Sequence, residues 1–327
     1  MKTIFSEKIQ PGDELRIIAP SSSAASMKAS VKRIADKRTK ELLGLKVTYS
    51  KNAFEKDLFG NSSIDSRVKD LHDAFRDKKV KGIACVRGGY NANTLLPYLD
   101  WELIRKNPKP IWGFSDITVL SNAIYAKTGL VTYIGPNYSS FGMDENKDNI
   151  EYMFDFFKKC LMSEEFFNVT PSKYIGERRH PFRKNKGYSI IQNGTAEGVL
   201  IGGHLSTINL LQGTEYMPNL QDVVLFIEDD DFGGDQTIFE FERNLESLLQ
   251  LPSVSIKGII LGRFQKDSKV TIKQIEHLFE SKKLSKNIPI VADANFGHTQ
   301  PIFTFPVGGV VRIKAKSGKV NIEILRH

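Results

Sequence analysis

Ser115 is a residue whose type and position in the sequence could support nucleophilic chemistry. It lies between an apolar stretch that ends at Trp112 and an amphipathic stretch that begins at about Asp116. This order predicts a sharp strand-to-helix turn, with the hydroxyl exposed and the backbone N–H groups of the helix start ready to receive negative charge. The surrounding residues do not form the Gly-x-Ser-x-Gly pentapeptide, and an ordinary N-cap serine fits the same position. Ser115 is therefore a candidate nucleophile, with a capping role as the alternative.

Two adjacent glycines follow another predicted strand. Residues 80–86 are mostly apolar, and Arg87, Gly88 and Gly89 come directly after them. Paired glycines let the backbone approach a ligand closely and present N–H groups to it, as an oxyanion hole requires. A simple turn has the same composition, so both interpretations stay open. Cys85, among apolar neighbours, fits a buried strand thiol better than a nucleophile.

A serine nucleophile needs a base, and the chain has six histidines. His298 lies among the turn-forming residues 295–301, just after the apolar stretch 288–292. A loop beyond the carboxyl end of a strand is where α/β sheets carry their active sites. His298 is therefore the candidate base, although many loop histidines have no such role.

The base in turn needs a carboxylate to orient it and to stabilise the imidazolium. Glu228 ends the most apolar stretch of the second half, 223–227, which predicts a directional and partly desolvated carboxylate. Residues 229–231 are aspartates, and such a cluster could instead hold a hard cation. Because the cluster lacks the glycine and the spacing of a calcium loop, we predict no metal site.

Alternating strands and helices in the first half must position the serine and the glycines. The predicted strands are 15–20, 45–49, 80–86 and 109–114, and the predicted helices are 27–43, 66–77 and a third from about 116. Such alternation favours βαβ units and a mostly parallel sheet. The first half is therefore predicted to be an α/β domain flanked by helices.

The second half of the chain is predicted to be a mixed, β-richer domain. Its apolar stretches are 196–201, 223–227, 258–261 and 288–292, with a hairpin-like end at 309–325 and a helix at 237–251. The intervening stretch 164–189 carries prolines and a charged run without clear periodicity. We expect an N-terminal α/β domain over 1–165, a connecting or active-site loop over 166–190, and a mixed C-terminal domain over 191–327.

The composition excludes several classes of protein. The chain has 327 residues, with 21 Phe, 10 Tyr and only two Cys, which argues against disorder and against a disulfide framework. No apolar run reaches the roughly 18–20 residues of a membrane span, and the first residues lack signal-peptide features. We therefore expect a cytoplasmic protein with no membrane partner.

The formal net charge of +8 gives little information about partners. The cations are spread along the chain and interleaved with acids, as on an ordinary solvated surface. Because no zinc-finger, RNP or basic-zipper spacing is present, we expect no nucleic-acid partner.

Taken together, several segments resemble the LD-carboxypeptidase family of serine peptidases, which includes the microcin C immunity carboxypeptidases. The matching segments, in family order from about residue 10 to 310, are PGDELRIIAPSS, CVRGGYNANTLLPYLD, NPKPIWGFSDITVL, GVLIGGHLSTINLLQGT, VVLFIEDD and NFGHTQPIFTFPVGG. The resemblance implies that Ser115 is the nucleophile, that Glu228 orients the base and that His298 is the base.

The same resemblance implies an oxyanion hole and a domain arrangement. The hole would consist of the backbone N–H groups of Gly89 and Asp116, with Gly88 close by. The N-terminal domain would carry the serine and the C-terminal domain the other two residues. The family commonly forms homodimers and needs no metal or cofactor.

One departure from the family pattern bears on the substrate. Murein LD-carboxypeptidases usually carry Asn after a second glycine pair, where this chain has Gly203 followed by His204. The segments IEDDDFGGDQTIFEFERNLESLL and GRFQ look closer to the immunity branch, in which an aromatic residue on a mobile loop stacks on a nucleotide base. Phe182 is the candidate for that residue, and Arg87 and Arg263 are candidates to engage an acidic group of the substrate. Gly88, Gly203 and His204 are further candidates for substrate contact.

The predicted function is that of a serine carboxypeptidase or amidase that cleaves a C-terminal amide through an acyl-enzyme. The expected partner is a small peptide or peptidyl-nucleotide, such as a microcin C-type compound or an acyl-adenylate analogue. One alternative is a murein tetrapeptide L,D-carboxypeptidase. An alternative of another class is a noncatalytic protein that closes two lobes on a ligand.

Overall fold

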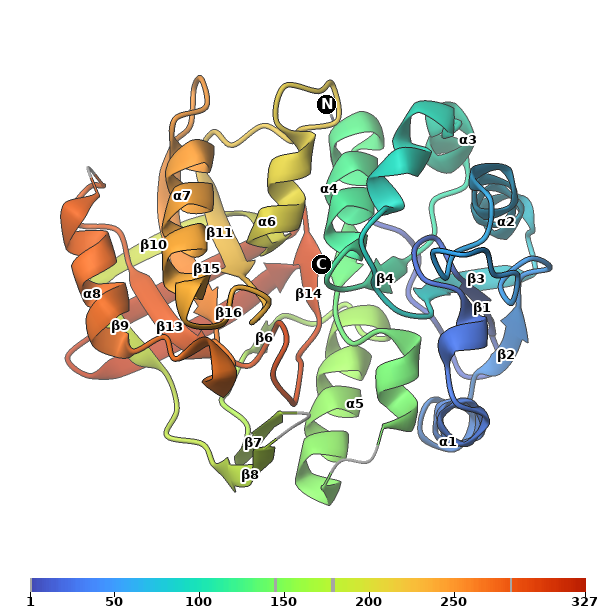
Figure 1. The fold of residues 1–327 in the computed structure, drawn as a ribbon, viewed down its shortest axis with the longest axis horizontal. Helices are drawn as coiled ribbons and strands as arrows, with labels where there is room; N and C mark the ends of the chain where they lie inside the picture. Colours follow the sequence, from blue (N-terminus) through green and yellow to red (C-terminus); the bar gives the residue numbers. More distant parts are fainter. Residues whose placement is uncertain (1, 144–145, 178–179, 283) are drawn as a thin grey trace.

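Two β-sheets with flanking helices form the two lobes of the chain (Figure 1). The computed structural model describes residues 2–143, 146–177, 180–282 and 284–327. One lobe holds the blue to green first part of the chain, and the other holds the yellow to red second part. This arrangement confirms the predicted α/β class, with one mostly parallel sheet and one mixed, β-richer sheet.

The sheet of the first lobe has six strands in the order β14-β5-β4-β3-β1-β2. They are β1 (Glu14–Ile18), β2 (Lys46–Tyr49), β3 (Val80–Cys85), β4 (Ile111–Gly113), β5 (Thr132–Ile134) and β14 (Phe305–Val307). The pairs among β1 to β5 are parallel, whereas β14 runs antiparallel to β5. Helices cover both faces of a parallel sheet, which explains why β3 and β4 are nearly continuous apolar stretches.

The first lobe has five α-helices among its described residues, of which those at 29–38, 64–76 and 117–128 match predicted helices, and those at 101–106 and 147–161 were not predicted. They are α1 (Ala29–Arg38), which a π-helical turn η2 (Thr39–Leu43) continues, α2 (Ile64–Arg76), α3 (Trp101–Lys106), α4 (Ile117–Thr128) and α5 (Lys147–Leu161), with 3-10 turns η1 (Ala24–Ser26), η3 (Ala92–Tyr98) and η4 (Tyr138–Gly142). Within the described ranges, no helix of either lobe is both long and apolar enough to cross a membrane.

The sheet of the second lobe has eight strands in the order β6-β16-β15-β10-β11-β12-β13-β9. They are β6 (Phe167–Asn168), β9 (Ser189–Gln192), β10 (Gly194–His204), β11 (Val223–Glu228), β12 (Ile256–Gly262), β13 (Ile290–Ala294), β15 (Val310–Lys316) and β16 (Lys319–Arg326). Strands β10 to β13 pair in parallel, and the outer strands pair antiparallel. The carboxyl ends of four parallel strands therefore meet at one edge of this sheet.

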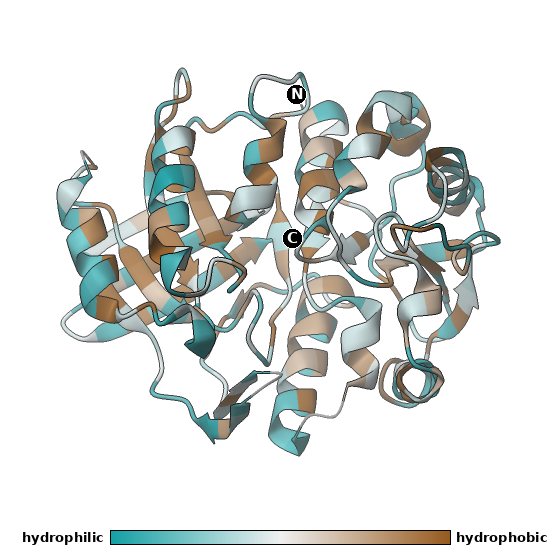
Figure 2. Cartoon of the chain, viewed as in Figure 1, coloured by the Kyte–Doolittle hydropathy of each residue, from teal (hydrophilic) through white to brown (hydrophobic). Residues whose placement is uncertain are grey.

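Short helices and turns connect the strands of the second lobe. They are α6 (Leu205–Ile208), η5 (Asn209–Leu211), η6 (Gly234–Gln236), α7 (Thr237–Leu249), η7 (Lys266–Ser268) and α8 (Ile272–Ser281). Figure 2 shows mainly hydrophobic strands behind α7 and α8, whose own surfaces alternate between hydrophobic and hydrophilic residues. This alternation is typical of helices that pack one face on a sheet.

The connection between the lobes differs from the expected loop. Residues 166–190 include β6, the start of β9 and a separate hairpin of β7 (Tyr174–Glu177) and β8 (His180–Lys184). The pairing partners of β6 and β9 are β16 and β13, which lie more than 90 residues away in sequence, so local periodicity cannot reveal them. Arg178 and Arg179 of the charged run lie outside the described residues. The domain boundaries stay a prediction, because β14 from the second half completes the first sheet.

Helix α4 lies where the two lobes meet (Figure 1). It is buried along most of its length and contacts both β10 and α6. The side chain of Asn122, on α4, donates from Nδ2 to the carbonyl of Gly202 at 2.9 Å. The start of α4 therefore faces the carboxyl ends of the second sheet.

Candidate active site

Ser115 lies in a strained turn between β4 and α4. Its φ is 63°, in the left-handed region that non-glycine residues rarely adopt. Hydrogen bonds that hold the turn include those from Phe114 N to Asn137 Oδ1 at 3.0 Å and from Thr118 N to the Ser115 carbonyl at 2.9 Å. The predicted strand-to-helix turn is therefore present, with the serine at its tip.

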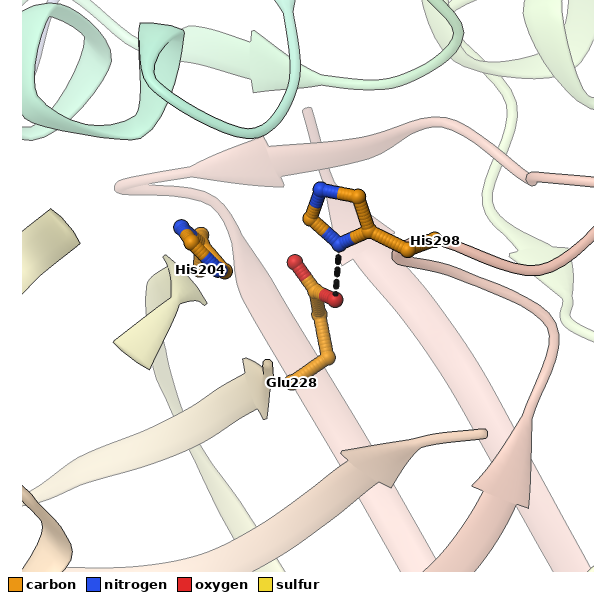
Figure 3. A group of neighbouring side chains, drawn as sticks. All are labelled: His204, Glu228 and His298. Atoms are coloured by element: carbon orange, nitrogen blue, oxygen red, sulfur yellow. Dashed lines mark hydrogen bonds and ion pairs between the residues drawn. The ribbon is translucent and has the colours of Figure 1, made fainter. Parts of the chain in front are cut away.

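A chain of two hydrogen bonds connects Ser115 to the second lobe. His298 Nε2 lies 3.1 Å from Ser115 Oγ, and His298 Nδ1 lies 2.8 Å from Glu228 Oε2. Figure 3 shows the imidazole of His298 above the carboxylate at the end of β11. The Glu228 side chain is only 3% exposed and that of His298 is 19% exposed. Because a carboxylate only accepts, Nδ1 carries the proton and Nε2 is free to accept from the serine hydroxyl.

The glycine pair lies next to the serine. A Cβ on Gly88 would come within 2.9 Å of Ser115 Cβ, so the backbone there runs directly against the serine. Neither Gly89 N–H nor Asp116 N–H has a hydrogen-bond acceptor among the described residues. Asp116 N–H directly follows the serine in the chain, and an unpaired backbone N–H group in such a position can stabilise an oxyanion.

The Asp116 side chain ties this glycine loop to the end of β1. Its Oδ2 accepts from Ser21 Oγ at 2.5 Å and from Ala92 N at 2.8 Å. The buried guanidinium of Arg67 donates to the Pro20 carbonyl at 3.2 Å, behind the same loop. No role was predicted for Ser21 or Arg67 from the sequence. The serines that follow the first predicted strand could have indicated Ser21, because the carboxyl ends of parallel strands meet at one edge of the sheet, where the site lies.

His204 forms a second imidazole–carboxylate pair beside the first. It ends β10 in register with Glu228 on β11, and its Nε2 lies 2.8 Å from Asp229 Oδ1. Its Nδ1 lies 2.6 Å from Thr207 Oγ1, and its ring centroid is 5.0 Å from that of His298. Burial lowers the pKa of His204, but the hydrogen bond to Asp229 and the surrounding carboxylates outweigh it and raise the pKa to about 9. His204 was predicted to contact the substrate, whereas its pairing with Asp229 was not predicted.

Two overlapping groups of side chains have the residue types of a metal site. His204, Glu228 and His298 offer ligand atoms within 4.8 Å of one another, and so do His204, Asp229 and Asp230. The ring nitrogens of both histidines already have hydrogen-bond partners, however. An ion would have to replace these bonds, so the arrangement fits two imidazole–carboxylate pairs better than a metal centre.

The remaining residues predicted for substrate contact lie in different surroundings. Arg263 is buried and donates to Asp293 Oδ1 at 2.8 Å, which engages its guanidinium inside the second lobe. Arg87 is exposed, with Nη1 3.3 Å from Ser26 Oγ. Gly203 has a φ of 126° and packs against Thr118 on α4.

Phe182 projects from the β7–β8 hairpin and is 42% exposed. Its ring covers Gly176, whose N–H donates to the Gln300 carbonyl at 2.9 Å. The hairpin is therefore attached to the loop that carries His298. Contact of Phe182, Arg87 or Arg263 with a substrate stays a prediction.

A hydroxyl, an imidazole and a carboxylate in this order, next to unpaired N–H groups, are typical of hydrolases with a nucleophilic serine. Comparison with known proteins specifies the family. Residues 15–135 match the LD-carboxypeptidase N-terminal domain, and residues 197–313 match the LD-carboxypeptidase C-terminal domain. The chain belongs to the LD-carboxypeptidase family, a family of peptidases, which confirms the resemblance seen in the sequence motifs.

Relatives over nearly the full length support this assignment. The putative carboxypeptidase YocD of Bacillus subtilis is 46% identical over 99% of this chain and 100% of its own. A probable murein peptide carboxypeptidase of Bacillus subtilis is 31% identical over 99% of this chain and 97% of its own. The microcin C7 self-immunity protein MccF of Escherichia coli is also 31% identical, over 85% of this chain and 84% of its own.

Solved structures show the same fold. The crystal structure of an MccF-like protein from Bacillus anthracis has a TM-score of 0.96 and 48% identity, covering 99% of this chain and 100% of the other. MccF in complex with aspartyl sulfamoyl adenosine has a TM-score of 0.85 and 27% identity, covering 99% of both chains. The lobes and sheets described above are therefore those of MccF-like proteins.

Proposed function

We propose that the protein is a serine carboxypeptidase or amidase with Ser115, His298 and Glu228 as its catalytic triad. The proposal depends mainly on one observation, the hydrogen-bonded chain from Ser115 Oγ through the His298 ring to Glu228. Ser115 Oγ attacks the scissile carbonyl as His298 Nε2 takes its proton. Glu228 keeps the tautomer in place and stabilises the imidazolium that forms.

The oxyanion of the tetrahedral intermediate would be held by the N–H groups of Gly89 and Asp116. His298 then gives its proton to the leaving amine, which departs and leaves Ser115 acylated. A water molecule, deprotonated by His298, attacks the acyl group and releases the acid and the free serine. Each proton taken by His298 is returned within the cycle, so no further reactant is needed.

For the substrate we propose a peptidyl-nucleotide or an acyl-adenylate analogue. The support is the close likeness to MccF-like proteins, one of which was solved with aspartyl sulfamoyl adenosine. A murein tetrapeptide is the second candidate, because a probable murein peptide carboxypeptidase is as similar in sequence as MccF is. Formation of a homodimer also stays a prediction, which sedimentation of the purified protein would test.

The decisive assay presents both substrate classes to the purified protein. A peptidyl-adenylate and a murein tetrapeptide are supplied together at equal concentration, and mass spectrometry follows the products. We expect faster release of the adenylate moiety, with no product from Ser115→Ala. Preferential loss of the terminal residue of the tetrapeptide would reverse the substrate assignment. If the protein cleaves neither compound, the proposed activity on both is contradicted.

The role of Phe182 is tested by comparing the two substrates. Phe182→Ala should raise KM for the peptidyl-adenylate and leave KM for the tetrapeptide unchanged, because only a nucleobase offers a ring for stacking. Phe166→Ala is the matched control, since Phe166 is also exposed, at 65%. An equal effect on both substrates would argue against base stacking by Phe182.

A further inference from the structure

Three strands that lie side by side in the first sheet, β1, β3 and β4, end at the same edge of that sheet (Figure 1). They pair in parallel, so the loops that follow them meet at their carboxyl ends. Ser21 follows β1, Gly88 and Gly89 follow β3, and Ser115 with Asp116 follows β4. The two N–H groups proposed for the oxyanion, those of Gly89 and Asp116, therefore belong to two different loops. Their separation depends on what holds these loops together.

The Asp116 carboxylate connects all three loops. Its Oδ2 accepts from Ser21 Oγ at 2.5 Å, after β1, and from Ala92 N at 2.8 Å, shortly after the glycine pair. An aspartate at a helix start commonly caps its own helix. Among the described residues, however, the Asp116 side chain makes no capping hydrogen bond to α4, and the residue is buried. The carboxylate therefore serves the neighbouring loops rather than its own helix.

The loop after β1 also lies directly against the glycine loop. Ser22 N donates to the Gly88 carbonyl at 3.3 Å. A Cβ on Gly89 would overlap Ser21 Oγ, so the hydroxyl packs on the Gly89 backbone itself. Ser21 is fully buried. Its hydroxyl therefore lies between the Asp116 carboxylate and the glycine whose N–H is proposed for the oxyanion.

A buried cation supports both donors to this carboxylate. The Arg67 guanidinium donates to the Pro20 carbonyl at 3.2 Å and to Asn91 Oδ1 at 3.1 Å, and the residue is buried. These two acceptors stand directly before Ser21 and directly before Ala92 in the chain. Arg67 thus fixes the two segments from which the donors come.

We propose that the Asp116 carboxylate and Ser21 are positioning groups for the oxyanion hole, whose hydrogen bond fixes Gly89 N–H relative to Asp116 N–H. The inference rests on the proposed function, in which these two N–H groups hold the oxyanion. Donors that are already in place stabilise negative charge without reorganising during the reaction, so a small displacement of either one weakens catalysis. Because the charge develops only on the way to the intermediate, loss of the bond should slow acylation and leave substrate affinity unchanged.

The test compares Ser21→Ala with Ser121→Ala. Both changes remove a buried serine hydroxyl, but Ser121 Oγ has no hydrogen-bond partner among the described residues. We expect Ser21→Ala to lower kcat by about 10- to 100-fold at unchanged KM, on whichever substrate the wild type cleaves. Labelling of Ser115 by a fluorophosphonate should slow by a similar factor, because the phosphoryl oxygen gains charge at the same N–H groups. Ser121→Ala should change neither rate.

Variants of Asp116 supply a rescue measurement. Asp116→Asn keeps an acceptor oxygen for Ser21 and Ala92, so it should retain most of the wild-type kcat. Asp116→Ala removes the acceptor and should lose at least as much as Ser21→Ala. Circular dichroism and urea unfolding show which variants are folded, and Ser21→Ala decides the matter if Asp116→Ala does not fold.

Several results would overturn the inference while the wild type is active. They are an unchanged kcat and labelling rate in Ser21→Ala, a change confined to KM or to stability, and an equal loss of kcat in Asp116→Asn and Asp116→Ala. A wild-type protein that neither cleaves substrate nor takes up label would instead contradict the proposed function, and with it the basis of this inference. The two failures are therefore distinguishable.

Discussion

At the scale of single residues, the candidate base is defined by what its two ring nitrogens contact. One nitrogen faces a nearly inaccessible carboxylate and the other faces the serine hydroxyl. Burial of Glu228 makes the interaction directional, because water cannot compete for the Nδ1 proton. The base is therefore fixed in the tautomer that can accept from Ser115.

Glu228→Gln should leave the fold intact and reduce the reaction rate. The amide can still contact Nδ1 but cannot stabilise an imidazolium, so we expect kcat/KM to fall by about 10²- to 10⁴-fold. Steady-state kinetics on the cleaved substrate measures the change. Glu240→Gln, at an exposed position on α7, is the matched control. A loss below threefold in Glu228→Gln would argue against a role for this carboxylate.

The His204–Asp229 pair should also make stability depend on pH. The pKa of His204 is raised from 6.5 to about 9, so its folded state binds a proton more tightly than the unfolded chain does. This contribution is fully present below about pH 6.5 and is lost as pH rises through 9. Urea unfolding should show that the wild type loses stability over this interval relative to His204→Gln. If the difference in unfolding free energy between the two proteins stayed constant over this pH interval, it would contradict an ion pair between His204 and Asp229.

At the scale of secondary structure, α4 joins Ser115, the proposed nucleophile, to the second sheet. Thr118, in its first turn, accepts the hydrogen bond of His204 N, and Asn122 one turn later binds the Gly202 carbonyl. These bonds fix the position of Ser115 relative to the ends of β10 and β11. The geometry of the triad therefore depends on a helix from one lobe and strands from the other.

Thr118→Val should weaken this junction without changing its volume much. Loss of the acceptor leaves His204 N–H buried and unpaired, which costs about 1–3 kcal/mol of unfolding free energy. We also expect a lower kcat, since Ser115 and His298 lie on opposite sides of the junction. Urea unfolding and steady-state kinetics test both effects, with Thr195→Val at an exposed position of β10 as control. Unchanged stability would show that the bond does not hold the lobes together.

The sequence predicted the elements whose signals are local. Buried parallel strands such as β3 and β11 are continuous apolar stretches, and Ser115, Glu228 and His298 stand where such stretches end. The pairing of β14 with β5 in the first sheet could not be predicted in this way, because the two strands lie far apart in sequence. The β7–β8 hairpin is local, but its charged stretch shows no clear periodicity, so it was not predicted either. The contacts of Asp116 with Ser21 and of Asp229 with His204 were missed because these residues also lie far apart in sequence.

At the scale of the whole molecule, the fold depends on packing rather than on covalent cross-links. Cys85 and Cys160 are free and buried, and burial raises the pKa of both thiols, that of Cys160 to about 12. Both sulfurs lie in the core of the first lobe. Neither thiol is therefore a nucleophile at neutral pH.

Iodoacetamide should consequently leave the native protein unmodified and fully active. After unfolding in guanidinium chloride, both cysteines should react, which intact-mass spectrometry would show as two added groups. Rapid modification of the native protein with loss of activity would contradict the burial of the two thiols in the core.

We propose that Ser115 is activated across the junction of the lobes by His298 and Glu228. Reaction with a fluorophosphonate, read by intact-mass and peptide mass spectrometry, tests it most directly. We expect one adduct on the wild type, located at Ser115, no adduct on Ser115→Ala, and greatly slowed labelling of His298→Gln. A folded wild-type protein that takes up no label, or Ser115→Ala labelled as fast as the wild type, would contradict it.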